Sequence, residues 1–300
     1  MAQDRANPAP PKRPEVDADL LGHRRPTEPA ARYESGPVAT PDLNWHEPNM
    51  ARMYSYLLGG KEYSPADRRA AEEALKLNPD GRLYARANRA FLGRAVRFLA
   101  EHGVRQFLDI GTGLPNMGNV HEVAQSVRPN ARTVYVDRDP MVATHGRALL
   151  ATDANTRMLE LDLRNPGLIL SRAGELLDFD QPVAILLVAI LHFIPDEEGP
   201  EGIVWDLMRF LEPGSHLVIS HVLASERTIP AAAAAYQGAT TQVVLRSQAE
   251  VGELFSAAGT ELVAPGLVRV PLWRPELNEG LARDDAAVVD LVGGIGRKER

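Results

Sequence analysis

The chain contains no cysteine. The sequence therefore predicts no disulfide framework, no thiolate metal site and no cysteine nucleophile, and it suits a reducing compartment such as the cytoplasm. Long apolar runs are also missing: the longest, residues 183–194, is broken by His192 and is too short to span a bilayer. The N-terminus lacks the apolar core of a signal peptide. We expect a cytoplasmic protein that has no membrane partner.

Positive charge is scarcer than negative charge. The chain has 33 Lys and Arg against 40 Asp and Glu, a net charge of -7, and no basic run is dense enough to follow a phosphate backbone. Nucleic acid is therefore a disfavoured partner. The histidines are scattered without metal-ligand spacing, so no metal site is predicted. At 300 residues the chain can bury one substantial core, and one large α/β domain is the expectation.

The two ends of the chain differ from its middle. Prolines recur through residues 1–40 and prevent a sustained helix or strand, which predicts a disordered tail. Residues 41–104 contain stretches in which apolar residues have helical spacing, and we expect them to form an N-terminal helical lid. Residues 276–300 are predicted to be a C-terminal tail with a weak helix.

Strands and helices alternate in the remaining region, residues 105–275. Strand character is found at residues 106–110, 133–137, 157–161, 183–188, 216–222, 261–263 and 267–270. The alternation is typical of a parallel sheet, and it predicts a Rossmann-like, doubly wound α/β fold with a mostly parallel, seven-stranded sheet. Residues 183–188 form a continuous apolar run, which indicates a strand at the centre of that sheet.

The first predicted strand ends in a tight turn. Apolar residues lead into Asp109, which is followed by Gly111 and Gly113. Glycines in such a turn let the backbone approach a ligand closely. A helix is expected to begin just beyond Pro115, with Asn116 or its neighbour as the cap, so that its N-terminus faces the same ligand. The turn therefore predicts a site for a nucleoside cofactor.

Two kinds of nucleoside cofactor compete for this turn. A dinucleotide site needs a third glycine three residues after the second, and this chain has Asn116 there. Asp109 is badly placed against a pyrophosphate, but it is well placed to accept hydrogen bonds from an ammonium group. A positively charged nucleoside without phosphate fits better, which weakens the alternative of a nicotinamide-dependent reductase.

In these residues the chain resembles the class I S-adenosylmethionine-dependent methyltransferases. Their first motif is similar to residues 109–113, and the resemblance extends through Asp137 and Asp162. Residues 51–61, which end in Leu-Leu-Gly-Gly-Lys, and residues 188–193 are similar to a narrower bacterial family with few characterised members. This likeness covers residues 45–275 and implies S-adenosylmethionine as the cofactor.

The resemblance implies a set of cofactor contacts. Gly111 and Gly113 would let the backbone approach the methionine part and the sugar, and Asp109 would orient the amino group. Asp137, at the end of the second strand, would bind both ribose hydroxyls. Asp139 is the substitute for Asp137, and its alternative role is to cap the following helix.

Further contacts are expected around the adenine and the sulfonium. Met141 could pack on the adenine face or could simply belong to the core. Asp162 and Leu163 would meet the adenine amino group and ring edge, and the alternative for Asp162 is an ordinary turn aspartate. Ala189, at the carboxyl end of the central strand, should lie beside the reacting sulfonium.

His192 is the main candidate for a side chain that faces the methyl acceptor, and its alternative is a loop histidine that satisfies backbone groups. His221 and Tyr56 are further candidates for contact with the acceptor. Methyl transfer from a sulfonium is an in-line displacement, and a base such as His192 could remove a proton from a hydroxyl or an amine.

The acceptor is expected to be a small molecule. The loop after the fourth strand lacks the Asn/Asp-Pro-Pro-aromatic run of enzymes that methylate base or amide nitrogens. The alternative function is a non-catalytic module that binds S-adenosylmethionine or S-adenosylhomocysteine for regulation. The sequence names neither the acceptor nor the oligomeric state.

Overall fold

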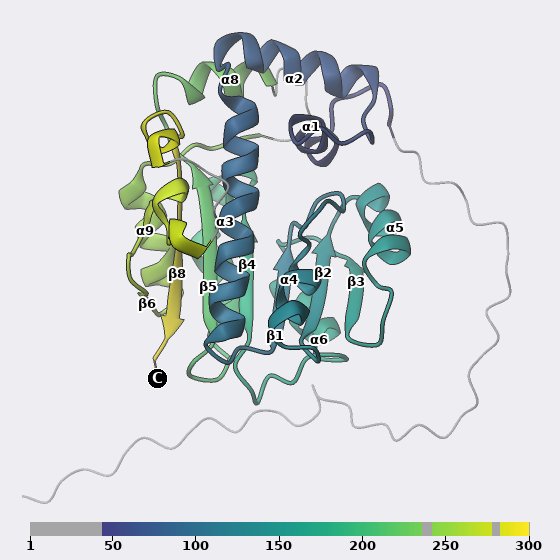
Figure 1. Ribbon diagram of the computed structural model, residues 1–300, viewed down its shortest axis with the longest axis vertical. Helices are drawn as coiled ribbons and strands as arrows, with labels where there is room; N and C mark the ends of the chain where they lie inside the picture. The colour runs from purple at the N-terminus through teal and green to yellow at the C-terminus, as the bar shows by residue number, and fades with distance from the viewer. Residues whose placement is uncertain (1–43, 236–241, 278–282, 300) are drawn as a thin grey trace, which may run out of the picture. The chain divides into compact units, whose positions relative to one another are not determined.

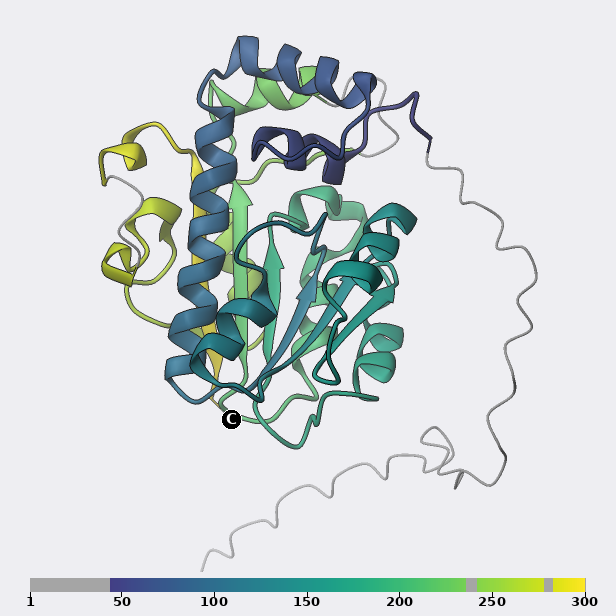
Figure 2. The same cartoon turned by 45° about the vertical axis from the view of Figure 1, so that its right-hand side comes forward.

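The computed structural model describes residues 44–235, 242–277 and 283–299. In this part of the chain an eight-stranded sheet is covered by helices (Figures 1 and 2). The α/β fold with a mostly parallel sheet is therefore confirmed, but the predicted number of seven strands is wrong because residues 291–298 form an additional strand. The disordered tail predicted for residues 1–40 lies outside the described residues. Within the described ranges, no helix has the length and apolar character needed to cross a membrane.

The strand order places a topological switch point in the middle of the sheet. The order is β3-β2-β1-β4-β5-β8-β6, and β7 pairs with β8 beside this path. Strands β1 to β5 are parallel, whereas β8 is antiparallel to its neighbours. Ligands of such sheets bind at the carboxyl ends of the strands where the order reverses, here between β1 and β4. The strands are β1 Gln106–Ile110, β2 Arg132–Asp137, β3 Thr156–Glu160, β4 Ala184–Val188, β5 His216–Val222, β6 Thr260–Leu262, β7 Val268–Arg269 and β8 Leu291–Lys298.

Both faces of the sheet are buried, because successive residues of each central strand point to opposite sides. Phe107 and Val218 pack into the core that α3, α4 and α5 cover. Leu108 and Leu217 pack into the core that α6, α7 and α9 cover. These helices are α3 Gly81–Glu101, α4 Val120–Val127, α5 Pro140–Leu149, α6 Pro166–Ala173, α7 Pro200–Met208 and α9 Gln248–Ala257.

The lid is smaller than residues 41–104. Phe91, Ala95 and Leu99 of α3 are fully buried against the sheet, so the lid prediction is wrong for this helix: its apolar stripe covers the sheet along the strands. Beyond the strand ends lie α1 (Met50–Leu57), α2 (Pro65–Leu77) and α8 (Thr228–Ala235), at the top of Figure 1. The sequence analysis did not find α8.

A buried ion pair joins α1 to α2. The Nε atom of Arg52 donates to Oδ2 of Asp67 over 2.6 Å, and both side chains are almost completely buried. Asp67 also accepts the backbone N–H groups of Asn49 and Ser64, at 2.8 and 2.6 Å. One carboxylate therefore holds the starts of both helices, and we infer that it fixes their relative position.

The predicted C-terminal tail, residues 276–300, is wrong for residues 291–298. These residues form β8, which pairs with β5 on one side and with β6 on the other. Their glycines hide the strand from sequence analysis, since glycine has low strand propensity. In the fold the glycines permit close packing: a Cβ atom on Gly293 would lie 2.7 Å from Phe91, and one on Gly296 would lie 2.8 Å from Phe255.

Candidate functional site

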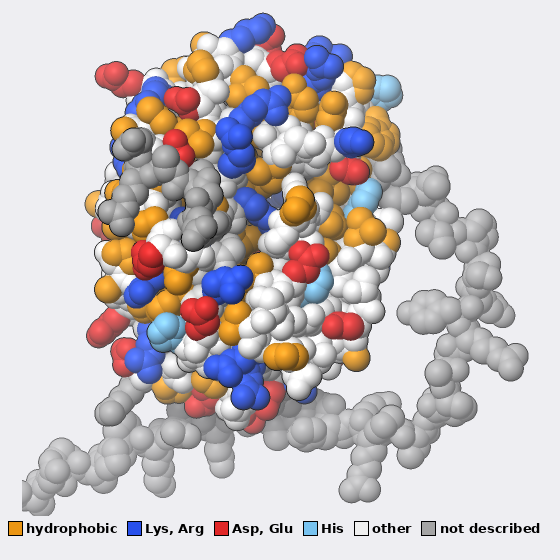
Figure 3. Space-filling model, in the orientation of Figure 1, with side chains coloured by type: hydrophobic (Ala, Val, Ile, Leu, Met, Phe, Trp, Pro, Cys, Tyr) orange, Lys and Arg blue, Asp and Glu red, His pale blue; other side chains and the backbone are white. Residues whose placement is uncertain are grey.

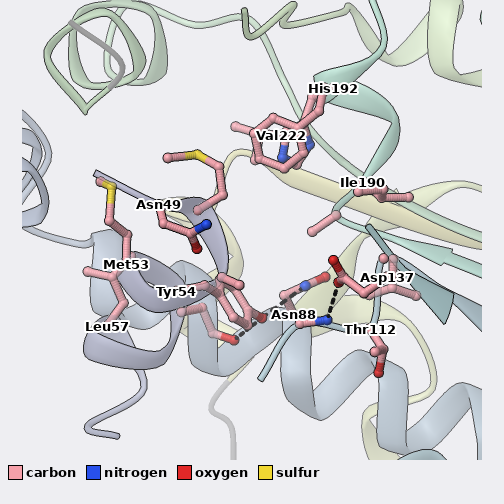
Figure 4. A pocket seen from close by; sticks show the side chains of 18 of the residues that line it. Asn49, Met53, Tyr54, Leu57, Asn88, Thr112, Asp137, Ile190, His192 and Val222 are labelled. Atoms are coloured by element: carbon pink, nitrogen blue, oxygen red, sulfur yellow. Dashed lines mark hydrogen bonds between the residues drawn. The ribbon is translucent and has the colours of Figure 1, made fainter. Parts of the chain in front are cut away.

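A cavity of about 420 Å³ lies at the carboxyl ends of β1, β2 and β4 and is bounded by the lid helices α1, α2 and α8. This volume is typical of sites for small ligands. Figure 4 shows Met53 and Leu57 of α1 on one side of it, and Thr112, Asp137 and Ile190 from the strand-end loops on the other. The cavity therefore coincides with the switch point of the sheet.

The glycine turn after β1 lines this cavity. Gly111 and Gly113 have φ values of +77° and +67°, a backbone region that glycine adopts without strain. A Cβ atom on Gly111 would lie 2.6 Å from the side chain of Ile190, whereas nothing lies within 4 Å of the corresponding position on Gly113. Gly111 is thus required by packing, and Gly113 leaves open space beside the turn.

The helix after the turn begins later than predicted. Its first residue is Val120, and the preceding Asn119 donates its backbone N–H to the carboxylate of Glu122 over 2.8 Å. The prediction that the helix starts just beyond Pro115 is wrong, because this capping pair sets its start. None of residues 114–119 lines the cavity, so the helix N-terminus does not face the candidate site.

Two carboxylates face the cavity from the ends of β1 and β2. Asp109 is only 4% exposed, and its burial raises its pKa to about 6, against the lowering effect of a hydrogen bond with Thr112. Asp137 accepts the backbone N–H groups of Gly113 and Asp139 at 2.9 and 3.0 Å. Its pKa is also raised to about 6, since burial outweighs these two bonds. Each group can accept hydrogen bonds from a bound cation or hydroxyl.

Asp139 serves as a cap and as a link to the lid. Its Oδ1 atom accepts the backbone N–H of Met141 over 2.7 Å, so it is the N-cap of α5, as the alternative interpretation expects. Its Oδ2 atom accepts a hydrogen bond from Nδ2 of Asn49, the N-cap of α1. Asp139 therefore caps α5 with one oxygen and holds the lid with the other, whereas the two oxygens of Asp137 are bonded only to backbone N–H groups of the strand-end turns.

Asp162 and Leu163 line the cavity after β3. The Oδ1 atom of Asp162 accepts the backbone N–H of Arg164 over 2.9 Å, and Nη1 of Arg138 lies 3.5 Å from its Oδ2 atom. Burial would raise the pKa of Asp162, but the bond from Arg164 and the two guanidinium charges lower it below its ordinary value. This aspartate is therefore both a turn residue and part of the cavity wall.

Ala189 follows β4 in a left-handed conformation with φ of +58°, which is unusual for a residue with a Cβ atom. Its backbone N–H donates to Oγ of Ser220 over 3.0 Å, and Ser220 in turn donates to Oδ1 of Asn88 over 2.6 Å. Asn88 donates to the hydroxyl of Tyr54 over 3.0 Å, the bond drawn in Figure 4. The Tyr54 hydroxyl donates to the carbonyl of Ala85. This chain of bonds runs from α1 to the end of β4.

His192 lies in a short 3₁₀ helix, Leu191–Phe193, and lines the cavity. Its ring is buried against Phe193 and His221, with centroid distances of 4.3 and 5.4 Å. The Nδ1 atom is buried and has no hydrogen-bond partner in the part of the chain that the structure describes. Burial, reinforced by His221 and Arg246, holds the pKa of His192 well below its usual value. The imidazole is therefore neutral at pH 7.

Comparison with known proteins identifies the family. A family model described as S-adenosyl methyltransferase matches residues 37–299. The chain belongs to this family. It is a class I S-adenosylmethionine-dependent methyltransferase, and its cofactor is S-adenosylmethionine. The match extends past the likeness seen in residues 45–275 and includes β8. No curated protein sequence gives a significant match.

Two solved structures resemble the methyltransferase closely. A DUF574 family protein from Streptomyces avermitilis is 38% identical over 85% of this chain and 99% of that chain, with a TM-score of 0.79. A candidate methyltransferase from Thermobifida fusca is 40% identical over 87% of this chain and 98% of that one, also with a TM-score of 0.79. Both relatives are therefore matched over almost their entire length.

The residues around the cavity suit S-adenosylmethionine. Two carboxylates, Asp109 and Asp137, lie where an ammonium group and hydroxyls need acceptors, and no basic side chain of the described residues is bonded to either. The open space beside Gly113 provides room for a ligand next to the backbone. Of the predicted cofactor contacts, Asp109, Gly111, Gly113, Asp137, Asp139, Asp162, Leu163 and Ala189 all line the cavity.

Three predicted site residues do not line the cavity of the methyltransferase. Met141, in the first turn of α5, is buried in the core, so the alternative interpretation as a core residue is the correct one. Tyr56 packs against the core between the lid helices, and its hydroxyl donates to Glu72 of α2 over 3.0 Å. His221 is fully buried and its Nε2 atom lies 3.1 Å from Nη1 of Arg246. Helix periodicity and strand alternation turn these side chains away from the cavity.

Sequence analysis missed several residues that line it, namely Asn49, Tyr54, Asn88 and Arg89. They belong to α1 and α3, whose relation to the strand ends is set by tertiary packing. Arg89 lowers the pKa of Asp109 by its charge, so it lies near that carboxylate. It also donates to Asn119 Oδ1 over 3.0 Å. The sequence around Arg89 contains no phosphate-binding or carboxylate-binding motif from which its role could have been predicted.

A second hollow lies on the outer side of α3. It is lined partly by Arg86, Arg89, Arg94 and Arg97, and Figure 3 shows basic side chains along the face that α3 occupies in Figure 1. Arg89 therefore lies between this hollow and the cavity. The described residues contain no group of three or more His, Asp or Glu side chains that could hold a metal ion.

Proposed function

We propose that this methyltransferase transfers a methyl group from S-adenosylmethionine to a small-molecule acceptor bound in the cavity, with His192 as the general base. The observation that carries the proposal is that one cavity joins the carboxylates at the strand ends to a space bounded by α1, α2 and α8. When bound, S-adenosylmethionine supplies an electrophilic methyl group on its sulfonium.

Different residues of the chain would bind different parts of the cofactor. Asp137 would accept the ribose hydroxyls, since each of its oxygens retains an acceptor site beyond its bond to the backbone. Asp109 would accept the amino group. Arg89, which is close to Asp109, would pair with the carboxylate of the methionine part. Asp162 and Leu163 would border the adenine.

His192 has the properties of a base that acts in a dry site. It is neutral at pH 7 because burial, His221 and Arg246 hold its pKa low. A ring nitrogen can therefore accept the proton of a hydroxyl or an amine, although the same surroundings make it a weaker base than a free imidazole. Its Nδ1 atom has no hydrogen-bond partner among the described residues. A positioned base of this kind contributes roughly 10²–10⁴-fold to a rate.

A small molecule is the acceptor that the surroundings favour. The lid helices lie over the strand ends (Figures 1 and 2), which restricts the space for a macromolecular chain, and the protein carries a net charge of -7. The comparisons lend no support to the alternative of a non-catalytic cofactor-binding module. In-line transfer requires only that donor and nucleophile be held together and that water be excluded.

The test uses S-adenosylmethionine with a labelled methyl group. The full chain is incubated with a panel of hydroxyl- and amine-bearing small molecules, and in parallel with total protein and total nucleic acid. We expect label in small molecules and formation of S-adenosylhomocysteine. Label confined to protein or nucleic acid, or binding of the cofactor without transfer to any acceptor, would reject the proposal.

The same assay tests His192. His192→Ala should lower turnover about 10²–10⁴-fold, while calorimetry gives an unchanged Kd for S-adenosylhomocysteine. His102→Ala is the control, because His102 is exposed at the end of α3 and does not line the cavity. Full activity of His192→Ala would exclude this histidine as the base without affecting the assignment of the cofactor.

A further inference from the structure

The cavity wall that the lid provides is apolar. Its side chains come from α1, α2 and α8, and several pack together in a small core of their own that includes Met53, Ala71 and Ala235. The lid residues that line the cavity are Met50, Ala51, Met53, Tyr54, Leu57, Ala71, Ala74, Leu75, Ala231 and Ala235. Tyr54 is the one polar side chain in this set.

Charge is confined to the other end of the cavity. Among the described residues of α1, α2 and α8, none that lines the cavity is charged. The charged side chains in the lining are Arg89 on α3 and six residues at the strand ends or just after them, namely Asp109, Asp137, Arg138, Asp139, Asp162 and Arg164. A charged group placed under the lid would therefore lose its hydration without meeting a counterion, which is strongly unfavourable.

The polar groups near the lid are largely committed to one another. The hydroxyl of Tyr54 accepts from Asn88 and donates to the carbonyl of Ala85. The other polar contact of Asn88 is to Ser220. These groups leave little hydrogen-bonding capacity for a strongly polar ligand. Among the described residues that line the cavity, the buried side-chain atoms without a partner are Oδ1 of Asn78, just after α2, and Nδ1 of His192, at the boundary between lid and strand ends.

Side-chain size adds a second constraint. Ala71 and Ala74 on α2 and Ala231 and Ala235 on α8 all line the cavity, and α2 and α8 lie side by side at the top of Figures 1 and 2. Alanines on two adjoining helices leave space that larger side chains would fill. Methionine, which α1 contributes, is flexible and polarizable and adapts to apolar and aromatic surfaces.

From this division of the cavity we infer that the methyl acceptor is an uncharged, mostly apolar molecule whose body lies under the lid. Only its reacting hydroxyl or amine extends toward His192 and the strand ends. The inference rests on the proposed function, because it assigns the lid side of the cavity to the acceptor. It makes Met53, Ala74 and Ala231 residues that determine acceptor specificity.

A ligand series of constant shape and varying charge tests this inference directly. The probes are 1-naphthol, 1-naphthoate and (1-naphthyl)methylammonium, each titrated by calorimetry into the full chain saturated with S-adenosylhomocysteine. We expect 1-naphthol to bind at least tenfold more tightly than either charged probe. Equal or tighter binding of a charged probe, or binding of none of the three, would overturn the inference.

Two variants locate the binding of 1-naphthol. Ala74→Leu fills space under the lid without adding charge and should weaken 1-naphthol at least tenfold, while the Kd of S-adenosylhomocysteine stays unchanged. Ala233→Leu is the matched control on the adjoining lid helix α8, because Ala233 is exposed and does not line the cavity. Thermal melts confirm that each variant is folded. Unchanged binding of 1-naphthol to folded Ala74→Leu would place its site elsewhere and overturn the inference.

This experiment separates the inference from the proposed function. Transfer of label to a charged small molecule, with no transfer to uncharged ones, would contradict the inference and leave the small-molecule methyltransferase intact. Absence of transfer to every small molecule would contradict the proposed function, whatever the affinities of the naphthalene probes.

Discussion

The two ends of the cavity are lined by different kinds of chemical group. At the strand ends, the wall consists of backbone turns and carboxylates, such as Gly113 and Asp137. Under the lid, it consists of apolar side chains from α1, α2 and α8, with no charge among the described residues of these helices that line it. The first kind of wall suits a cationic nucleoside, and the second suits an uncharged organic molecule.

The two ends also owe their geometry to different interactions. The strand-end loops follow from the register of the central sheet, in which Asp109 is paired with Tyr135 and Leu186 on the neighbouring strands. The lid is held by its own small apolar core and by a few polar contacts, namely the ion pair of Arg52 with Asp67 and the bond between Asn49 and Asp139. Changes in the lid should therefore leave the cofactor end largely intact.

Among the variants that distinguish the lid from the strand ends, Asp67→Ala should have the largest effect. The substitution leaves the buried guanidinium of Arg52 without its counterion, which typically costs about 3–5 kcal/mol. We expect hydrogen exchange to show lost protection in α1 and α2, while the amides of β1 and β4 keep theirs. Glu73→Ala is the control, because Glu73 forms an exposed pair with Lys76, and such pairs are worth about 0–1 kcal/mol. Equal loss of protection in lid and sheet would show that the lid has no independent anchor.

Asp137→Asn tests the cofactor end alone. An amide can offer only its oxygen as an acceptor, so one of the N–H groups of Gly113 and Asp139 loses its partner. The ribose also loses a charged acceptor, and the Kd of S-adenosylhomocysteine should rise about 100-fold, which corresponds to about 2.7 kcal/mol. Asp206→Asn, at an exposed ion pair on α7, removes the same charge and should leave the Kd unchanged. An unaltered Kd in Asp137→Asn would remove this residue from the cofactor site.

The dependence of cofactor affinity on pH follows from the same carboxylates. Burial raises the pKa of both Asp109 and Asp137 to about 6, and the amino group of the ligand favours their ionised forms. Affinity for S-adenosylhomocysteine should therefore be constant from pH 7 to 8 and fall as the pH drops through 6. The slope should reach about tenfold per pH unit for each carboxylate that titrates.

Asp109→Asn supplies the control for this pH profile. It should bind more weakly at pH 7 and show a shallower decline between pH 6 and 5, since one titrating group is gone. The linkage to folding has the opposite sign: an acid whose pKa is raised in the fold stabilises the unliganded protein most at low pH. A binding profile that stays flat from pH 8 to 5 would contradict the role of both carboxylates.

The cofactor end was predictable from sequence because its signals are local. A buried strand, Asp109, two glycines and the acids at the ends of β2 and β3 lie in short segments, and the parallel sheet brings strand ends together by its topology. The predictions that were wrong at the cofactor end concerned features that depend on tertiary packing or on helix capping. Met141 belongs to the core because α5 presents that face to the sheet, and α4 starts late because Asn119 and Glu122 form its cap.

The lid end was less predictable because its residues are far apart in sequence. Tyr56 was chosen on α1, yet it is Tyr54, two residues earlier, that lines the cavity. The sequence of α8, with its run of alanines, carries no periodic signal. The glycines of β8 likewise conceal a strand whose packing against Phe91 and Phe255 requires them. Such assignments need the tertiary structure.

Tyr54→Phe probes the hydrogen bonds that connect the two ends, and we expect the smallest effect from it. The substitution removes the bonds of the Tyr54 hydroxyl to Asn88 and Ala85. Each neutral bond is worth about 0.5–1.5 kcal/mol. Because Asn88 and Ser220 link this hydroxyl to the strained Ala189, we expect kcat to fall up to about tenfold. The Kd of S-adenosylhomocysteine should stay unchanged.

Tyr56→Phe is the matched control on the same helix, since the Tyr56 hydroxyl bonds Glu72 outside the cavity. A positioning role for Tyr54 predicts that its variant lowers kcat more than KM changes and that Tyr56→Phe alters neither. A larger loss of kcat in Tyr56→Phe, or an equal weakening of S-adenosylhomocysteine in both variants, would mean that the lid and the strand ends are not coupled through Asn88. The two ends would then have to be treated as independent sites that merely share one cavity.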